Sequence, residues 1–170
     1  MAHDGQYRKQ TNIPYITHPF DVALILQKMN CPDILVVAGL LHDTLEDTSV
    51  VLADIVENFG PEVAAIVEAC SEPDRSLPWE DRKQHTINQL RDAPLEVKLV
   101  ACADKLSNLK TVRADLQENG EAVWERFNRG REKQAWYYRG VARSLRHGVA
   151  DLDRYPIFEQ LDNLVQLVFE

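Results

Sequence analysis

The chain has 170 residues, of which 45% are hydrophobic and 27% charged, and its formal net charge is −8. This composition is typical of one soluble globular domain and excludes a disordered chain. The acidic charge argues against broad nucleic-acid binding, which needs a basic surface that neutralises phosphates. The three cysteines are far apart and form no CxxC motif, which indicates reduced thiols rather than a disulfide framework or a thiolate zinc site.

No apolar stretch approaches the roughly 18 residues that a membrane-spanning helix needs. The first ten residues, MAHDGQYRKQ, contain no apolar signal segment. We therefore expect a cytoplasmic protein without membrane association.

Apolar residues recur at helical spacing through nearly the whole chain. A first amphipathic helix follows His18–Pro19, and residues 34–45 are apolar on most sides, which predicts a central buried helix. A short helix over residues 52–59 should end at Gly60, and Pro61 is well placed to begin the next helix.

The second half of the chain continues the helical pattern. The predicted order is a polar loop over 71–78, helices over 79–90 and 95–109, a break at Asn119–Gly120, a long Arg-rich helix over 121–145 and a final amphipathic helix over 157–168. No strand alternation, repeat or linker interrupts this order. The sequence therefore predicts one all-α domain over residues 1–170.

The stretch GLLHDTLED, residues 39–47, is the most informative in the chain, because one imidazole and three carboxylates follow an apolar run. On a continuous helix His42 would lie over Glu46 and Asp43 over Asp47, since residues four apart share a face. Like charges beside buried leucines repel one another, so the cluster needs protons or a cation. The neighbouring histidine favours a divalent metal.

Two further positions support a metal site. His18 lies in PYITHP at the start of a helix, and Asp104 is a polar residue inside the apolar helix ACADKLSNL. Together with His42 and Asp43 they form a mixed nitrogen and oxygen ligand set, which suits Mn, Fe, Zn or a similar first-row ion and suits Ca poorly. Two aspartates would also neutralise a divalent cation.

The order of the motifs GQYRK, PYITHP, AGLLHDTLEDT and ADKLSNL resembles that of the HD-domain metal-dependent phosphohydrolases. It is especially similar to the hydrolase domain of RelA/SpoT homologues and to the small free-standing alarmone hydrolases. The core motifs lie in residues 2–109, and the C-terminal helices of residues 120–170 resemble the family less. The resemblance implies a single-domain HD-type helical bundle that uses Mn²⁺ to hydrolyse the 3′-pyrophosphate of (p)ppGpp-type nucleotides.

The resemblance also implies a role for each motif residue. The metal ligands would be His18, His42, Asp43 and Asp104. The acidic pair Glu46 and Asp47 would orient or deprotonate the attacking water. The substrate-binding residues would be Arg8, Lys9, Lys105 and Asn108, with Arg8 stacking on the base.

Two alternatives stay open: an HD phosphohydrolase for another nucleotide, and a non-catalytic nucleotide-sensing module. In each case the expected partner is a small nucleotide rather than a nucleic acid. We expect Trp136, Tyr137 and Tyr138 to pack in the core and His3 and His147 to lie on the surface. The sequence leaves the purine base, the native metal and the oligomeric state undecided.

Overall fold

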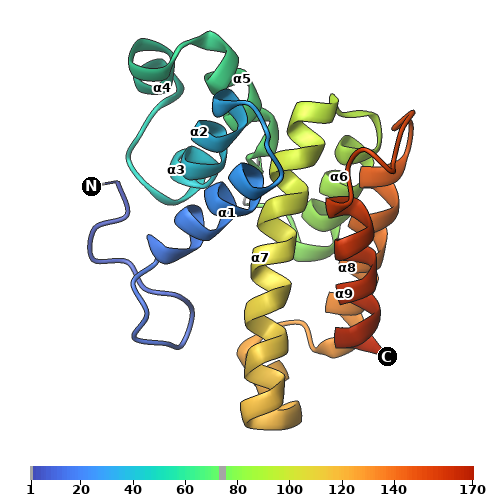
Figure 1. Ribbon diagram of the computed structural model, residues 1–170. Helices are drawn as coiled ribbons and strands as arrows, with labels where there is room; N and C mark the ends of the chain where they lie inside the picture. Colours follow the sequence, from blue (N-terminus) through green and yellow to red (C-terminus); the bar gives the residue numbers. More distant parts are fainter. Residues whose placement is uncertain (1, 73–75) are drawn as a thin grey trace. The chain divides into compact units, whose positions relative to one another are not determined.

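The computed structural model describes residues 2–72 and 76–170, and Figure 1 shows that the chain is built from helices. Within this described part, the only β feature is an isolated antiparallel bridge between Tyr7 and Pro14. The all-α prediction is therefore confirmed. Two compact units can be distinguished: residues 2–72 with Pro94–Asp104, and residues 76–93 with Lys105–Glu170. The prediction of one domain over residues 1–170 stays a prediction.

The first unit contains five complete helices and the first turns of a sixth. These are α1 (Thr17–Lys28), α2 (Asp33–Leu41), α3 (Thr44–Asp47), α4 (Leu52–Phe59), α5 (Pro61–Cys70) and the first turns of α7 (Leu95–Asn119). Helix α2 packs against α1 and α5, and α4 packs against α5. Gly60 separates α4 from α5 with a φ of 87°, a conformation that glycine adopts readily.

The contact between α1 and α2 is close because Gly39 has no side chain. A Cβ atom at this position would lie 2.7 Å from Cδ1 of Leu26 and 3.2 Å from Cγ1 of Val22. Both of these α1 side chains are fully buried. The glycine therefore lets the end of α2 approach α1, and this places the residues after α2 beside the start of α1.

The predicted continuous helix over residues 34–45 is wrong. Helix α2 ends at Leu41, His42 and Asp43 form a turn, and α3 begins at Thr44. The hydroxyl of Thr44 donates to the carbonyl of Leu41 at 2.7 Å and stabilises the turn. Apolar spacing cannot mark this break, because the residues on both sides of it face buried surface.

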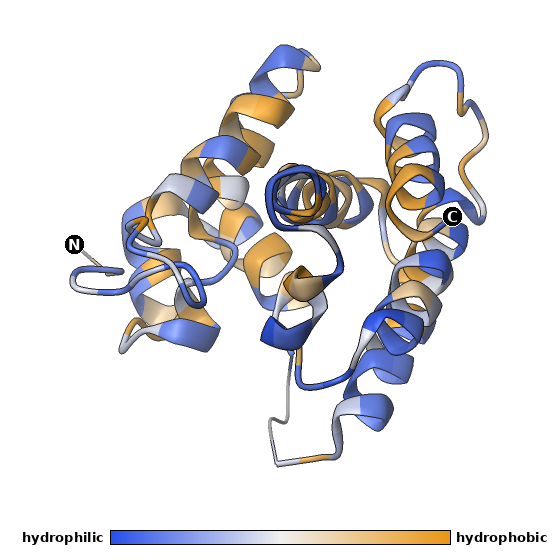
Figure 2. Ribbon diagram, turned by 90° about the horizontal axis from the view of Figure 1, so that it is seen from below, coloured by the Kyte–Doolittle hydropathy of each residue, from blue (hydrophilic) through white to orange (hydrophobic). Residues whose placement is uncertain are grey.

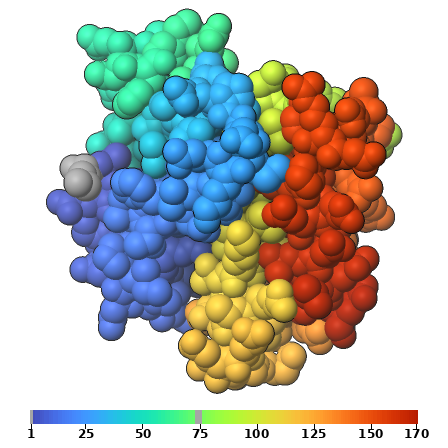
Figure 3. All heavy atoms as spheres, viewed as in Figure 1, coloured from blue at the N-terminus to red at the C-terminus, as the bar shows by residue number. Residues whose placement is uncertain are grey.

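The second unit is also helical. It contains α6 (Trp79–Asp92), the remainder of α7, the 3₁₀ helix η1 (Gly120–Arg126), α8 (Arg131–Arg146) and α9 (Ile157–Phe169). Helix α8 packs against α6 and α9. In Figure 3 the yellow C-terminal part of α7 lies next to the red α9, and side chains of both helices line one groove. The loop predicted over 71–78 falls partly on residues 73–75, outside the described residues.

The predicted long helix over residues 121–145 is also wrong. The chain forms η1, turns through residues 127–130 and only then begins α8. The ring of Trp124 lies 5.7 Å from that of Phe127 and 5.4 Å from that of Phe169. These aromatic contacts stabilise the turn, and helical spacing alone does not predict them.

The apolar stripe of α9 is buried within its own unit. Figure 2 shows orange and blue segments alternating along the helices, as expected for amphipathic elements. The buried residues of α9 are Ile157, Phe158, Leu161, Leu164, Val165, Val168 and Phe169. Leu167 of the same helix is 64% exposed. Tyr137 and Tyr138 are buried as predicted.

Among the residues that the structure describes, no helix combines the length and the hydropathy needed to cross a lipid bilayer.

Candidate metal centre

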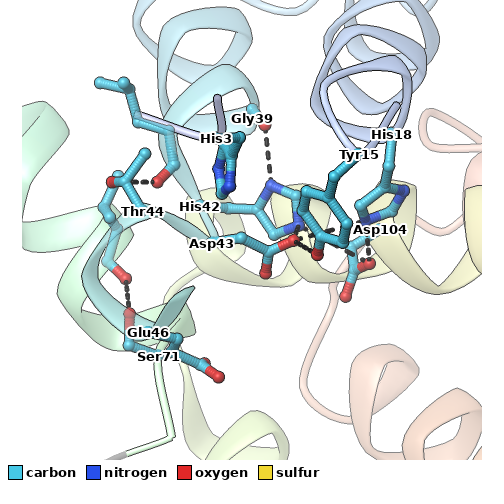
Figure 4. Close-up of polar contacts among 12 residues, drawn as sticks. His3, Tyr15, His18, Gly39, His42, Asp43, Thr44, Glu46, Ser71 and Asp104 are labelled. Carbon is cyan, nitrogen blue, oxygen red and sulfur yellow. Dashed lines mark hydrogen bonds and ion pairs between the residues drawn. The ribbon is translucent and has the colours of Figure 1, made fainter. Parts of the chain in front are cut away.

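Three of the four predicted metal ligands converge on one point in the first unit. One ligand atom from each of His18, His42 and Asp104 lies within 4.8 Å of the other two. Nε2 of His18 is 3.1 Å from Oδ1 of Asp104. Figure 4 shows these side chains pointing toward one another from α1, from the turn after α2 and from α7. All three are buried.

Asp43 adjoins this group. Its Oδ2 atom is 3.0 Å from Nε2 of His42 and 3.7 Å from Nε2 of His18. Neighbouring side chains on a regular α-helix diverge by about 100° around the axis. The turn between α2 and α3 therefore allows His42 and Asp43, which are consecutive in the chain, to reach the same place.

The orientation of the His42 ring fits a metal ligand. Nδ1 of His42 lies 2.8 Å from the carbonyl oxygen of Gly39, and because a carbonyl only accepts, Nδ1 is the donor. Nε2 is buried and makes no aligned hydrogen bond. A buried nitrogen without a hydrogen-bond partner is costly. A histidine that binds a metal through one nitrogen commonly donates its other ring N–H in this way.

The carboxylates around His42 stabilise a positive charge on its ring or beside it. Burial lowers the pKa of His42, but Asp104 and Asp43 outweigh burial and raise the pKa to about 10. Burial raises the pKa of Asp43, and His42 outweighs this effect, so the pKa of Asp43 is lowered. The centre therefore binds a proton when no cation is present, and a divalent cation competes with that proton.

Tyr15 is a part of this centre that sequence reasoning missed. Its hydroxyl donates to Oδ2 of Asp43 at 2.5 Å. Burial and then the Asp43 carboxylate raise the pKa of Tyr15, so the hydroxyl keeps its proton. The only signal in the sequence was its position in PYITHP, three residues before His18.

His3 is buried, so the prediction that it lies on the surface is wrong. Its ring centroid is 4.9 Å from that of Tyr15, and its Nδ1 is 2.8 Å from Oε1 of Gln6. Nε2 of Gln6 donates to the backbone carbonyl of Asp47 at 2.6 Å. The N-terminal segment therefore supports both the tyrosine that holds Asp43 and the end of α3.

The acidic pair lies on α3, beyond the turn. Oε1 of Glu46 accepts a hydrogen bond of 2.7 Å from the backbone N–H of Glu72. In Figure 4 Glu46 lies apart from the group formed by His18, His42 and Asp104. The expected stacking of His42 over Glu46 assumed one continuous helix, and the break at His42–Asp43 removes that geometric argument.

Two of the four predicted substrate-binding residues, Arg8 and Lys9, lie in the first unit, and the other two, Lys105 and Asn108, lie in the second. Cζ of Arg8 is 5.9 Å from the centroid of Tyr15, so Arg8 lies beside the centre, while Lys9 is exposed. Nζ of Lys105 is 5.9 Å from the ring centroid of Tyr137 in the second unit. Asn108 follows Asp104 by four residues on α7, so the two share a helix face.

Comparison with known proteins relates the whole arrangement to one family. A family model described as HD domain matches residues 1–133. A guanosine-3′,5′-bis(diphosphate) 3′-pyrophosphohydrolase of Mus musculus is 41% identical over 111 residues, which are 64% of this chain and 62% of the mouse protein. The chain therefore aligns with less than two thirds of that relative.

Two solved structures extend the similarity. A protein from Listeria monocytogenes has a TM-score of 0.84 and 42% identity, covering 89% of this chain and 98% of its own. A structure described as a metazoan ortholog of SpoT that hydrolyzes ppGpp has a TM-score of 0.78 and 31% identity, covering 98% of this chain and 88% of its own. On the match over residues 1–133, this chain belongs to the HD domain family.

Proposed function

We propose that this protein is a metal-dependent alarmone 3′-pyrophosphohydrolase that acts on (p)ppGpp-type nucleotides. The observation that carries the proposal is the convergence of two imidazoles and a carboxylate, with Asp43 adjoining, in one buried place. The names of the mouse relative and of the metazoan structure support this substrate class. We also propose that residues 1–170 act as one domain in the cytoplasm.

We propose Mn²⁺ as the cation, held by His18, His42, Asp43 and Asp104. When bound, such a cation would supply Lewis acidity toward a phosphoryl oxygen and lower the pKa of a water molecule. Imidazole nitrogens favour first-row transition metals, whereas Mg²⁺ prefers an all-oxygen octahedron. The Nε2 atom of His42, which lies 3.0 Å from Oδ2 of Asp43 and 3.7 Å from Oδ1 of Asp104, supports this assignment.

The side chains of Tyr15, Glu46 and Asp47 would have the remaining roles in the reaction. Tyr15 would hold the Asp43 carboxylate in one orientation through its hydroxyl. Glu46 and Asp47 would orient the attacking water and accept its proton, since carboxylates commonly serve as general bases. The support for this pair is its place on α3, the short helix that begins directly after Asp43.

The nucleotide would be bound by the four basic and polar residues that the sequence motifs indicate. Arg8 would stack on the purine, because a guanidinium is planar and stacks on aromatic faces. Lys9, Lys105 and Asn108 would contact phosphate or ribose. The support for Asn108 is its place one turn after Asp104 on α7.

A substrate panel tests the proposal. The Mn²⁺-loaded protein is incubated with ppGpp, pppGpp, ppApp and ordinary nucleoside triphosphates, and the products are separated by anion-exchange chromatography. We expect pyrophosphate and GDP from ppGpp, loss of turnover on chelation, and better recovery with Mn²⁺ than with Mg²⁺. Turnover of ordinary nucleotides alone would indicate a different HD phosphohydrolase. Tight ppGpp binding without any product would indicate a sensing module.

A further inference from the structure

A cavity of the second unit lies between α6 and α8. Its volume is about 410 Å³, within the usual range of roughly 300–1,000 Å³ for small-molecule pockets. The lining residues from α6 are Gln84, Ile87, Asn88 and Arg91. Those from α8 and the residue after it are Gly140, Arg143, Ser144 and His147.

The lining is basic although the chain as a whole carries a net charge of −8. None of these described lining residues is acidic. The Nε atom of Arg143 donates to the carbonyl of Arg139 at 3.3 Å, and Arg143 forms no ion pair with a carboxylate of residues 2–72 or 76–170. Its two terminal nitrogens are therefore available to an anion.

Arg91 is oriented by His147. One terminal nitrogen of Arg91 lies 3.4 Å from Nε2 of His147, and Nδ1 of His147 lies 3.3 Å from the carbonyl oxygen of Arg91. The carboxylate of Asp92 is 4.0 Å from Nδ1 of His147, but its side chain is 81% exposed, so solvent screens this charge. A guanidinium held in this way loses little freedom when it binds a ligand.

Neutral donors complete the cavity. Ser144 is only 7% exposed and is one of the residues that line the cavity. Nε2 of Gln84 donates to Oδ1 of Asn88 at 2.9 Å, which leaves the amide nitrogen of Asn88 as a donor. A Cβ atom at Gly140 would lie 2.5 Å from Cδ1 of Ile87, so the glycine allows the two helices to approach closely.

From the convergence of Arg91, Arg143, Ser144 and Asn88 on one cavity, we propose that it binds the phosphate groups of a small molecule. Guanidinium groups bind phosphate oxygens in a bidentate manner, and serine and asparagine donate to the oxygens that remain. The proposal does not depend on the function proposed above, because it involves no residue of the metal centre.

Isothermal titration calorimetry with inorganic pyrophosphate tests the proposal. The protein is first passed over a chelating resin to remove bound metal, so that no metal draws pyrophosphate to His18, His42 and Asp104. We expect saturable binding that Arg143→Gln weakens by about tenfold or more, as expected for the loss of one charge-assisted contact. Arg139→Gln removes the same charge from the same helix outside the cavity lining and should change the affinity by less than about twofold.

The two variants distinguish phosphate binding at a defined site from a general electrostatic attraction by the charges of α8. Equal weakening by Arg143→Gln and Arg139→Gln would contradict the proposal, because only the overall charge would then matter. Absence of saturable binding to the unsubstituted protein would also contradict it. A parallel titration with ADP shows whether the phosphate groups belong to an organic molecule. Tighter binding of ADP than of pyrophosphate would indicate that the ligand is an organic phosphate ester.

Discussion

The phenol of Tyr15 donates a 2.5 Å hydrogen bond to Oδ2 of Asp43, the oxygen that also lies 3.0 Å from Nε2 of His42. One carboxylate oxygen is thus shared between a neutral donor and an imidazole. By holding Oδ2, the tyrosine hydroxyl also fixes the orientation of the second carboxylate oxygen of Asp43. Residues that orient metal ligands contribute strongly to metal affinity.

Tyr15→Phe should therefore lower the affinity for Mn²⁺ by about 10- to 100-fold, the usual effect of removing such a supporting hydrogen bond. Competition with a chromogenic chelator measures this affinity without recourse to activity. Tyr7→Phe is the matched control, because Tyr7 is 60% exposed. Identical Mn²⁺ affinity in both variants would show that the hydroxyl has no role in the metal centre.

Asp104→Ala should abolish Mn²⁺ binding and turnover, because it removes one of the three atoms that lie within 4.8 Å of one another. The helical circular-dichroism spectrum should persist, since α7 continues well beyond this position in both directions. Elemental analysis after dialysis gives the metal content. Asp92→Ala, at an 81% exposed side chain, is the control and should retain the metal. Full Mn²⁺ content in Asp104→Ala would exclude this residue as a ligand.

Glu46→Gln and Asp47→Asn should retain the metal but lower kcat by about 10²–10⁴, the range for general acid–base catalysis. The glutamine keeps an oxygen that can accept the 2.7 Å hydrogen bond from the backbone of Glu72, so stability should change little. KM should change much less than kcat, because proton transfer belongs to the transition state. Steady-state kinetics on ppGpp measure both constants, and near-normal kcat in both variants would assign the pair to structure.

Gly39→Ala should destabilise the fold by about 1–3 kcal/mol, as expected for overpacking a tight helix contact. The new Cβ atom would lie 2.7 Å from Cδ1 of Leu26. Denaturant unfolding measures the free energy of unfolding. In a Leu26→Ala background the additional cost of Gly39→Ala should shrink, because the clashing atom is gone. If Gly39→Ala lowers the free energy of unfolding equally in both backgrounds, the clash does not involve Leu26.

Much of the fold follows from local patterns. Helical spacing predicted α1, α4, α5 and α9 closely, because each carries one apolar face bounded by a glycine, a proline or a polar loop. The breaks at His42–Asp43 and at residues 127–130 were not predicted. The first break is stabilised by a hydrogen bond from the Thr44 side chain to the backbone of Leu41, and the second by contact of Trp124 with the distant Phe169. The spacing of apolar residues contains neither contact.

The site was predicted unevenly for a similar reason. His18, His42 and Asp104 lie in distinct motifs, and the structure brings them together. Tyr15 and His3 were missed because their roles arise from packing between the N-terminal segment and the turn after α2. A tyrosine or histidine near a motif has no periodic signal of its own.

The turn between α2 and α3 also limits how this protein can change in evolution. A single inserted residue between Leu41 and Thr44 would rotate every later side chain of α3 by about 100° relative to α2. Such an insertion would separate His42 from Asp43, or turn Glu46 and Asp47 away from them, in one step. Lineages of this protein should therefore vary by point substitution here, while tolerating changes of length in exposed positions such as Ser76–Pro78.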